Sequence, residues 1–246
     1  MSARPRAAGR FRRSDPLTSV ILIFPLFVLY EIGILVVPGA YNGADVITAQ
    51  ILRLLHGQRG LYFALNLGFL AAFIGLVAYL SRRHSFDRRL VWPVVIESTI
   101  YALTMGSLIV FVMVDLLHVD PRLQLGPPLR AGAGGSPGLL ASIVISLGAG
   151  VHEELIFRVV LFGGTTLLLQ RVGGVARGWA IVIGVVASSV LFSAAHHVIG
   201  GEAFRVGAFV YRVLCGVFFA ALFQLRGLAV AVYTHALYDI YVFVLR

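Results

Sequence analysis

Six of the ionisable side chains inside apolar segments in the second half of the chain have types and spacings that could do chemistry. They are Glu153, Glu154, Arg158, His196, His235 and Asp239. An ionisable residue at the centre of a membrane helix costs about 2.5–3.5 kcal/mol on insertion scales, so such residues are rare there and mark functional sites. We therefore treat these six as candidate site residues.

The first group occurs in "GAGVHEELIFRVVLFGG", residues 148–164. On a helix, Glu154 and Arg158 are four residues apart and share one face, where they can form an ion pair. Glu153 points about 100° away from Glu154 and has no cation at that spacing. We expect a structural pair between Glu154 and Arg158. Glu153 is then available for chemistry or for binding another helix.

The other two groups supply histidines. His196 lies one helical turn after Phe192, in "LFSAAHHVIG", and His235 lies one turn before Asp239, in "VYTHALYDIYVF". A carboxylate at this spacing can accept a hydrogen bond from one imidazole nitrogen and fix the tautomer and orientation of the ring. Taken separately, His196 could be an interfacial residue, and His235 with Asp239 could be a pair that braces a bundle.

Taken together, one carboxylate and two imidazoles on three helices can activate a water molecule. The carboxylate takes the proton, and the imidazoles position the water or stabilise an oxyanion. The same groups, Glu153, His196 and His235, could instead hold a divalent metal ion such as zinc as a His₂Glu set. Composition does not choose between these mechanisms. Both require the three side chains to converge on one cavity, which we predict.

The elements that must position these residues are predicted from composition. The chain has 246 residues, of which 59% are hydrophobic and 13% charged, and its mean hydropathy is +0.92. Soluble domains are about half apolar and about a quarter charged, so an all-α, polytopic transmembrane helix bundle is indicated. A span needs about 20 apolar residues, which gives about seven spans. They are residues 17–38, 61–81, 91–117, 139–169, 179–199, 206–225 and 227–245.

We expect one membrane domain over residues 17–246, with the catalytic motifs in 139–245, after a basic, disordered segment at 1–16. The run 139–169 would be about 46 Å long as one helix, so it must tilt, kink or protrude. Residues 44–56 are amphipathic and could lie on the surface or re-enter the membrane. Residues 119–138 are rich in Gly and Pro and predict an external loop between two halves.

The charge pattern predicts an orientation. The net charge is +9, and all of the basic Lys-or-Arg residues are arginines, since the sequence has no lysine. These arginines flank apolar spans, which is typical of topology signals and gives no reason to expect a nucleic-acid partner. With the N-terminus in the cytoplasm, the inner side carries twelve of them, against six outside. The inner set is Arg4, Arg6, Arg10, Arg12, Arg13, Arg82, Arg83, Arg88, Arg89, Arg171, Arg177 and Arg226.

The missing lysine favours a GC-rich, bacterial genome. We therefore expect an integral protein of the bacterial inner membrane with a cytoplasmic N-terminus. Its partners would be the lipid bilayer and a protein or peptide substrate within the membrane.

The three groups, in this order on separate apolar spans, resemble the motifs of a known family. E-E-x-x-x-R is present at Glu153–Arg158, F-x-x-x-H at Phe192–His196, and H-x-x-x-N, or a similar small polar residue, at His235–Asp239. The chain is thus similar to the CAAX-prenyl-protease and bacteriocin-processing (CPBP, formerly Abi) family of intramembrane endopeptidases. The resemblance covers about residues 139–245.

The resemblance implies a helical bundle with its site inside, opening to water through a cavity. By resemblance, Glu153 is the general base, His196 helps to hold the water, and His235 with Asp239 supports the oxyanion, while Glu154 and Arg158 brace the site. Asp239 departs from the asparagine that is frequent at its position and, if ionised, would orient or charge His235. We expect no cofactor and a metal-free site; if a metal is present, its ligands would be Glu153, His196 and His235.

The substrate implied is a membrane-associated or sorted protein that is cleaved near its C-terminal tail. Two other classes remain open. A proton-coupled transporter could use Glu31, Glu97 and Asp115 as a relay with the C-terminal charges. A non-catalytic immunity or scaffold protein would keep the bundle without the chemistry. The sequence does not fit the zinc intramembrane proteases, which carry H-E-x-x-H, because Ile156 stands where the second histidine is required.

Overall fold

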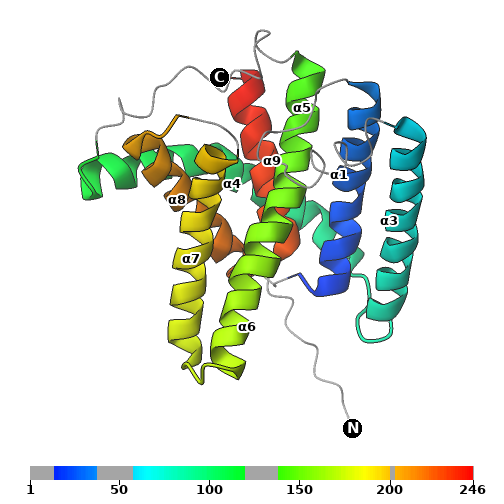
Figure 1. Cartoon of the computed structure of the whole chain (residues 1–246), viewed down its shortest axis with the longest axis horizontal. Coiled ribbons are helices and arrows are strands. Elements are labelled where there is room, and N and C mark those ends of the chain that lie inside the picture. The colour runs from blue at the N-terminus through cyan, green and yellow to red at the C-terminus, as the bar shows by residue number, and fades with distance from the viewer. Residues whose placement is uncertain (1–13, 38–57, 120–137, 200–202, 246) are drawn as a thin grey trace.

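The structure is a computed structural model that describes residues 14–37, 58–119, 138–199 and 203–245. Within these ranges the chain is helical and has no strand, which confirms the predicted fold class. The predicted amphipathic segment 44–56 and almost all of the loop 119–138 lie outside the described residues. The helices pack side by side as a bundle (Figure 1).

The helical elements follow the predicted spans closely. Their bounds are α1 (Pro16–Val36), α3 (Arg59–Leu80), η1 (Arg88–Leu90), α4 (Val91–Phe111), η2 (Val112–Leu116), α5 (Leu139–Gly148), η4 (Ala149–Glu153), η5 (Leu155–Gly163), α6 (Gly164–Arg171), α7 (Arg177–Val198), α8 (Val206–Arg226) and α9 (Leu228–Leu245). Helix α1 begins at Pro16 because Asp15 caps it by accepting a hydrogen bond from the Thr18 backbone.

Among the residues that the structure describes, six helical segments are long and apolar enough to cross a membrane. Helix α3 is the most exposed example, since no residue of its apolar stretch Phe63–Leu80 is buried inside the protein. Its Phe63 and Ile74 side chains are 56% and 59% exposed. A contiguous apolar surface of this kind is unfavourable in water, whereas hydrocarbon accepts it. The protein is therefore an integral membrane protein.

The seventh predicted span is α9, a shorter apolar helix at the centre of the bundle (Figure 1). It packs against α1, α4, α5 and α8. Ala229 and Ala231 on this helix are fully buried. Small side chains let neighbouring helices approach closely inside membranes. As a result α9 carries His235 into the interior, where only 4% of the residue is exposed.

The run Leu139–Arg171 forms one 33-residue helical segment made of α5, η4, η5 and α6. Its middle has π-helical hydrogen bonding at Ala149–Glu153 and again at Leu155–Gly163. π-helical segments are rare in proteins and are frequently found at functional sites. Of the three predicted outcomes for this long run, protrusion is visible, because its α6 end extends past the neighbouring ends of α1 and α3 (Figure 1).

Two glycines bring α1 and α9 against the upper part of this run. A Cβ atom on Gly148 would overlap the ring of Tyr30 in α1. A Cβ atom on Gly150 would lie 2.9 Å from the carbonyl oxygen of Val232 in α9. Only glycine allows backbones to approach so closely. The contact at Gly150 holds the next turn, which carries the two glutamates, against the central helix.

Candidate active site

The site is built on a fully buried ion pair. Arg158 Nε donates to Glu154 Oε2 at 3.0 Å, and neither side chain is exposed. The guanidinium also lies against two aromatic rings, with Cζ 5.1 Å from the centroid of Phe192 and 5.8 Å from that of Phe219. The predicted pairing of Glu154 with Arg158 is present. Pairing and aromatic contact reduce the cost of keeping both charges out of water.

The second oxygen of Glu154 holds His235. Nδ1 of His235 lies 2.8 Å from Glu154 Oε1, and the imidazole stacks on Phe219 with ring centroids 4.5 Å apart and planes at 14°. Since the carboxylate is already paired with Arg158, it accepts and the imidazole Nδ1–H donates. This contact fixes both the plane and the tautomer of the ring. Nε2 is left facing the interior of the bundle.

Glu153 faces two imidazoles at once. Its Oε2 lies 3.8 Å from Nε2 of His196 and 3.9 Å from Nε2 of His235, and the residue is 1% exposed. Nδ1 of His196 lies 2.9 Å from the carbonyl oxygen of Phe192. A carbonyl only accepts, so Nδ1–H donates and Nε2 points toward Glu153. The side chains of Glu153, His196 and His235 therefore converge, although they come from three helical segments.

The depth of His196 follows from the hairpin between α6 and α7. His196 stands 19 residues after the start of α7 at Arg177, and Glu153 stands 18 residues before the end of α6 at Arg171. Two antiparallel helices joined by a short turn bring residues at equal distances from that turn to the same level. Counting residues from the α6–α7 turn in each direction therefore shows, from the sequence, that His196 and Glu153 lie at the same depth in the bundle. His196 ends its helix within the bundle because α7 starts in the protruding part of the hairpin.

Asp239 lies beside His235 but does not hold it as closely as Glu154 does. Asp239 Oδ2 is 3.6 Å from Nε2 of His235, which is longer than a hydrogen bond. The anchoring carboxylate is Glu154, 81 residues earlier in the chain. Local spacing could not reveal this contact, because only the packing of η4 against α9 brings the residues together. Asp239 instead adds another carboxylate near Nε2 of His235, the ring nitrogen that Glu154 does not contact.

Glu153, Glu154, His196 and His235, with Arg158 and Asp239 beside them, form a glutamate–histidine cluster. Several other ionisable residues of the spans lie outside this cluster. Glu97 in α4 accepts from Arg226 at 2.6 and 2.7 Å and from the Tyr101 hydroxyl at 2.8 Å, so its carboxylate braces the far end of α8. His152, next to Glu153, turns toward α1, where its ring lies 4.9 Å from that of Tyr30. Asp115 in η2 is exposed. None of these three carries its charge into the cluster.

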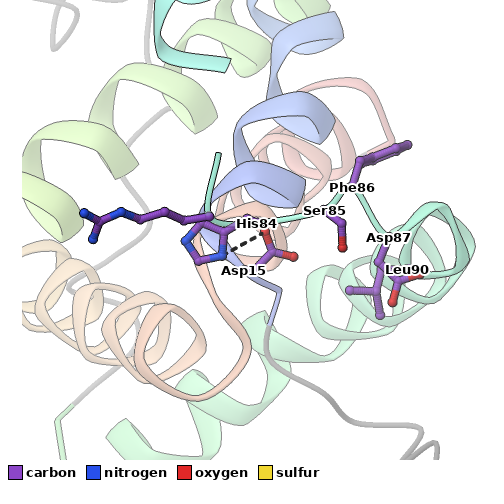
Figure 2. Close-up of a pocket in the computed structure, with 7 residues that line it drawn as sticks. Asp15, His84, Ser85, Phe86, Asp87 and Leu90 are labelled. Atoms are coloured by element: carbon purple, nitrogen blue, oxygen red, sulfur yellow. Dashed lines mark ion pairs between the residues drawn. The ribbon is translucent and has the colours of Figure 1, made fainter. Parts of the chain in front are cut away.

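A separate hollow of about 380 Å³ lies where α1 begins (Figure 2). Figure 2 shows His84 and Asp15 on its wall, with 4.0 Å between His84 Nδ1 and Asp15 Oδ1. Burial opposes ionisation of the Asp15 carboxyl, but hydrogen bonds from Thr18 outweigh burial and hold its pKa below the ordinary value. The residues that line the hollow include no member of the glutamate–histidine cluster. The hollow therefore belongs to the loop between α3 and η1 and to the start of α1, and it is separate from the candidate active site.

No group of three or more His, Cys, Asp or Glu side chains within the described ranges is arranged to hold a metal ion. The candidate ligands Glu153, His196 and His235 point toward one another. Glu153 Oε2 lies 3.8 Å from Nε2 of His196 and 3.9 Å from Nε2 of His235.

The comparison with protein families gives the following match. Residues 135–241 match the family described as type II CAAX prenyl endopeptidase Rce1-like. The chain contains an Rce1-like domain. No curated protein and no solved structure matches the chain. The members of the matched family are peptide hydrolases, so the enzyme class predicted from the motifs is confirmed.

The Rce1-like domain contains all six candidate residues. It begins just before α5 and ends two residues after Asp239. Helices α1, α3 and α4 lie outside the match, yet α1 and α4 both pack against α9. The matched region thus spans α5 to α9, and α1 and α4 complete the wall around the central helix.

Proposed function

We propose that the chain is a glutamate-dependent intramembrane endopeptidase in which Glu153 activates water. The observation that carries this proposal is the meeting of Glu153 Oε2 with Nε2 of His196 and Nε2 of His235 at 3.8 and 3.9 Å inside the membrane bundle. These separations exceed a direct hydrogen bond and suit a bridging oxygen atom. A carboxylate and an imidazole nitrogen around one oxygen are the parts that general-base hydrolysis needs.

The two histidines take different roles because their Nδ1 atoms are held differently. In neutral His196, Nδ1–H is engaged by the Phe192 carbonyl, so Nε2 is an acceptor and orients the attacking water together with Glu153. In His235, Nδ1–H is engaged by Glu154, so Nε2 donates to an oxyanion only when both ring nitrogens carry protons. The carboxylates of Glu154 and Asp239 compensate the charge of that imidazolium.

The reaction then balances within the cluster. Glu153 takes one proton from water as the water oxygen attacks the carbonyl carbon of the scissile peptide bond. The resulting oxyanion accepts a hydrogen bond from Nε2 of His235. Glu153 returns its proton to the departing nitrogen, the C–N bond breaks, and the products are a carboxylic acid and an amine. Arg158 and Glu154 hold His235 in place throughout and touch no reacting atom.

We propose that the substrate is a membrane-associated protein cleaved near its C-terminal tail. The matched family takes its printed name from CAAX prenyl endopeptidases, and a site enclosed by helices suits an extended chain end that enters from the membrane. We further propose that the enzyme resides in a bacterial inner membrane with its N-terminus in the cytoplasm, as the arginine distribution favours. Glu153, His196 and His235 act without a metal in this mechanism.

The first experiment replaces Glu153 by Gln in cells and compares the C-terminal peptides of membrane and secreted proteins with those of wild type. Gln has the shape of Glu but cannot take a proton, so we expect turnover to fall by about 10²–10⁴-fold. Uncleaved tails should accumulate. Asp115→Asn is the matched control, because it makes the same carboxylate-to-amide change at an exposed position in η2. It should leave the tails unchanged.

Normal processing in cells that hold the Glu153→Gln protein at wild-type level would contradict the proposal. Metal dependence is tested on the purified wild-type enzyme by elemental analysis and by treatment with a chelator. We expect less than one metal ion per chain and unchanged turnover. A stoichiometric metal that is lost in Glu153→Gln and in His196→Ala would replace the general-base mechanism by a His₂Glu metal site.

A further inference from the structure

The hollow at the start of α1 has no part in the mechanism above, yet it has the size and the polar lining of a binding site. Its volume of about 380 Å³ lies within the range of small-molecule sites, about 300–1,000 Å³. Charged, polar and apolar side chains share its wall. They are Asp15, Arg83, His84, Ser85, Phe86, Asp87 and Leu90. In Figure 2, His84 and Asp15 lie at one side of the hollow and Asp87 at the other.

Hydrogen bonds fix the two sides of the hollow relative to each other. The Thr18 side chain in α1 is fully buried, and its hydroxyl donates to Asp15 Oδ2 at 2.6 Å and accepts from the Asp87 backbone N–H at 3.2 Å. The backbone N–H of Ser14 donates to the carbonyl oxygen of Arg226 at 3.0 Å. The start of α1 is thus joined to the loop after α3 and to the end of α8. The hollow is therefore formed before any ligand enters it.

Both signs of charge line the hollow, which restricts the ligand chemistry. Asp87 Oδ1 accepts from the Arg89 backbone at 3.1 Å, but a carboxylate has room for several donors, so Asp15 and Asp87 can each accept another. The exposed Arg83 carries a guanidinium, which suits the oxygens of a phosphate. A simple anion would meet the two carboxylates, and a simple cation would meet Arg83. The chemistry that fits both is an ammonium group and a phosphate on one molecule.

The hollow lies where a membrane helix meets the water interface. Trp92, two residues after Leu90, is 72% exposed, and Phe86 in the lining is 42% exposed. Exposed tryptophans at the ends of membrane spans lie at the level of the lipid headgroups. Helix α3, which ends at Leu80 just before this loop, has an apolar stretch with no buried residue and so faces lipid. Phospholipid headgroups therefore surround the hollow, and Phe86 and Leu90 offer apolar contact to the glycerol and the first acyl carbons.

We propose that the hollow binds the headgroup of a zwitterionic phospholipid, with the phosphate at Arg83 and a primary ammonium group at Asp15 and Asp87. A primary ammonium donates hydrogen bonds to carboxylates, whereas a quaternary ammonium has no N–H to donate. The bound headgroup joins the start of α1 to the loop after α3. Because the unfolded chain has no such hollow, binding stabilises the folded protein. The inference goes beyond the proposed peptidase function and does not depend on it.

The test measures thermal unfolding of the purified, delipidated protein in detergent. The probe is dihexanoyl phosphatidylethanolamine, compared with phosphatidylcholine and phosphatidylglycerol of the same chain length. A ligand at about ten times its Kd should raise the Tm of a protein of this size by about 3–6 °C. We expect phosphatidylethanolamine to reach this shift at a concentration about 10-fold below that of the other two, because only its ammonium donates hydrogen bonds to the carboxylates.

Two variants assign the two charges of the headgroup. Arg83→Gln should raise the concentration needed for phosphatidylethanolamine and for phosphatidylglycerol alike by about 10-fold, because both carry the phosphate. Asp87→Asn should weaken phosphatidylethanolamine alone and so remove its advantage. Arg82→Gln is the matched control, since Arg82 is exposed in the same loop but does not line the hollow. It should bind all three lipids as wild type does.

Soluble phosphoethanolamine and inorganic phosphate separate a lipid from a free phosphate compound. Both lack the apolar part that Phe86 and Leu90 contact, so they should need far higher concentrations than the lipid for the same shift. Stabilisation by either of them at the lipid's concentration would assign the hollow to a soluble ligand and overturn the inference. Equal shifts from the three lipids, the absence of any shift, or an Arg83→Gln protein that binds like Arg82→Gln would overturn it as well. The mechanism proposed for Glu153 stands in each of these cases.

Discussion

At the scale of single residues, Glu154 links the two halves of the site. One of its oxygens pairs with Arg158 and the other accepts from His235, so one buried carboxylate neutralises a cation and also sets an imidazole. Glu153, the next residue, leaves that structural network and faces the two Nε2 atoms. The two adjacent glutamates therefore have different surroundings: Glu154 holds the site together, and Glu153 is the residue to which the proposed mechanism assigns proton transfer.

This difference predicts a non-additive pattern of stability. Glu154→Gln or Arg158→Met alone leaves a buried charge without its partner, and each should lower the free energy of unfolding by about 3–5 kcal/mol. The double variant has no uncompensated charge and should lose clearly less than the sum of the two. Its turnover should nevertheless stay about 10²-fold below wild type, because an amide at position 154 can still accept from His235 but no longer compensates the charge of an imidazolium. Thermal unfolding in detergent and peptide cleavage measure the two effects.

The control for this cycle is the pair Glu97 and Arg226, which is partly buried at the other end of α8. Glu97→Gln with Arg226→Met should change stability but leave turnover per folded molecule as in wild type. Strictly additive losses in the Glu154 and Arg158 cycle, or a double variant with full activity, would show that Glu154 does not connect the ion pair to His235.

At the scale of elements, the decisive feature is the long helical run from Leu139 to Arg171. Its π-helical middle carries both glutamates, and its lower half forms the hairpin that brings His196 to the level of Glu153. The upper half is held by close contacts with α1 and α9 at Gly148 and Gly150. The placement of Glu153 against His235 thus depends on how closely the backbones of this run and of α9 approach.

Adding one methyl group tests that dependence. At Gly150, the new Cβ would lie 2.9 Å from the Val232 carbonyl oxygen and the Ala236 nitrogen, so backbone must move. We expect Gly150→Ala to lower the free energy of unfolding by about 1–3 kcal/mol. It should also reduce turnover, because α9 and His235 shift away from Glu153. Unfolding and cleavage assays on the same preparations check both effects.

Gly68 in α3 provides the matched comparison, since nothing lies within 4 Å of its added Cβ. Gly68→Ala should be neutral or should stabilise by up to about 1 kcal/mol, as expected for glycine in a helix. Turnover should not change. A Gly150→Ala enzyme as active and as stable as Gly68→Ala would refute the requirement for close contact between the run and α9.

At the scale of the whole molecule, the protein is a bundle whose candidate catalytic groups lie around one shielded helix. The Rce1-like domain, residues 135–241, supplies every member of the cluster. The N-terminal helices contribute walls: α1 and α4 cover α9, and α3 adds a largely lipid-facing helix. The loop after α3 and the turn between α6 and α7 lie at the same end of the bundle (Figure 1).

The proposed orientation predicts which ends react with a membrane-impermeant thiol reagent. With the only cysteine removed as Cys215→Ala, single cysteines at Ser85 and Val172 should react only from the cytoplasmic side. Val172 is 79% exposed in the α6–α7 turn. A cysteine at Gly138, exposed at the opposite end where α5 starts, should react only from outside. Labelling of intact cells and of inverted vesicles distinguishes the sides, and the reverse pattern would refute a cytoplasmic N-terminus.

The sequence by itself determined the class of fold, the span positions and the chemical groups. Apolar runs of about 20 residues can satisfy their backbone hydrogen bonds in lipid only as helices, so composition alone predicts the bundle. The Glu154–Arg158 pair also followed from sequence, because residues four apart on a helix are neighbours by local geometry.

Only the tertiary structure decided which groups meet. His235 was expected to be oriented by Asp239, four residues away, but it is held more closely by Glu154, 81 residues away. The approach of three segments to one carboxylate oxygen depends on the turn between α6 and α7, on glycine contacts with α9 and on the stacking of Phe219. These are contacts between distant parts of the chain. Spacing along one helix carries no information about them, because their geometry is fixed by how the helices pack.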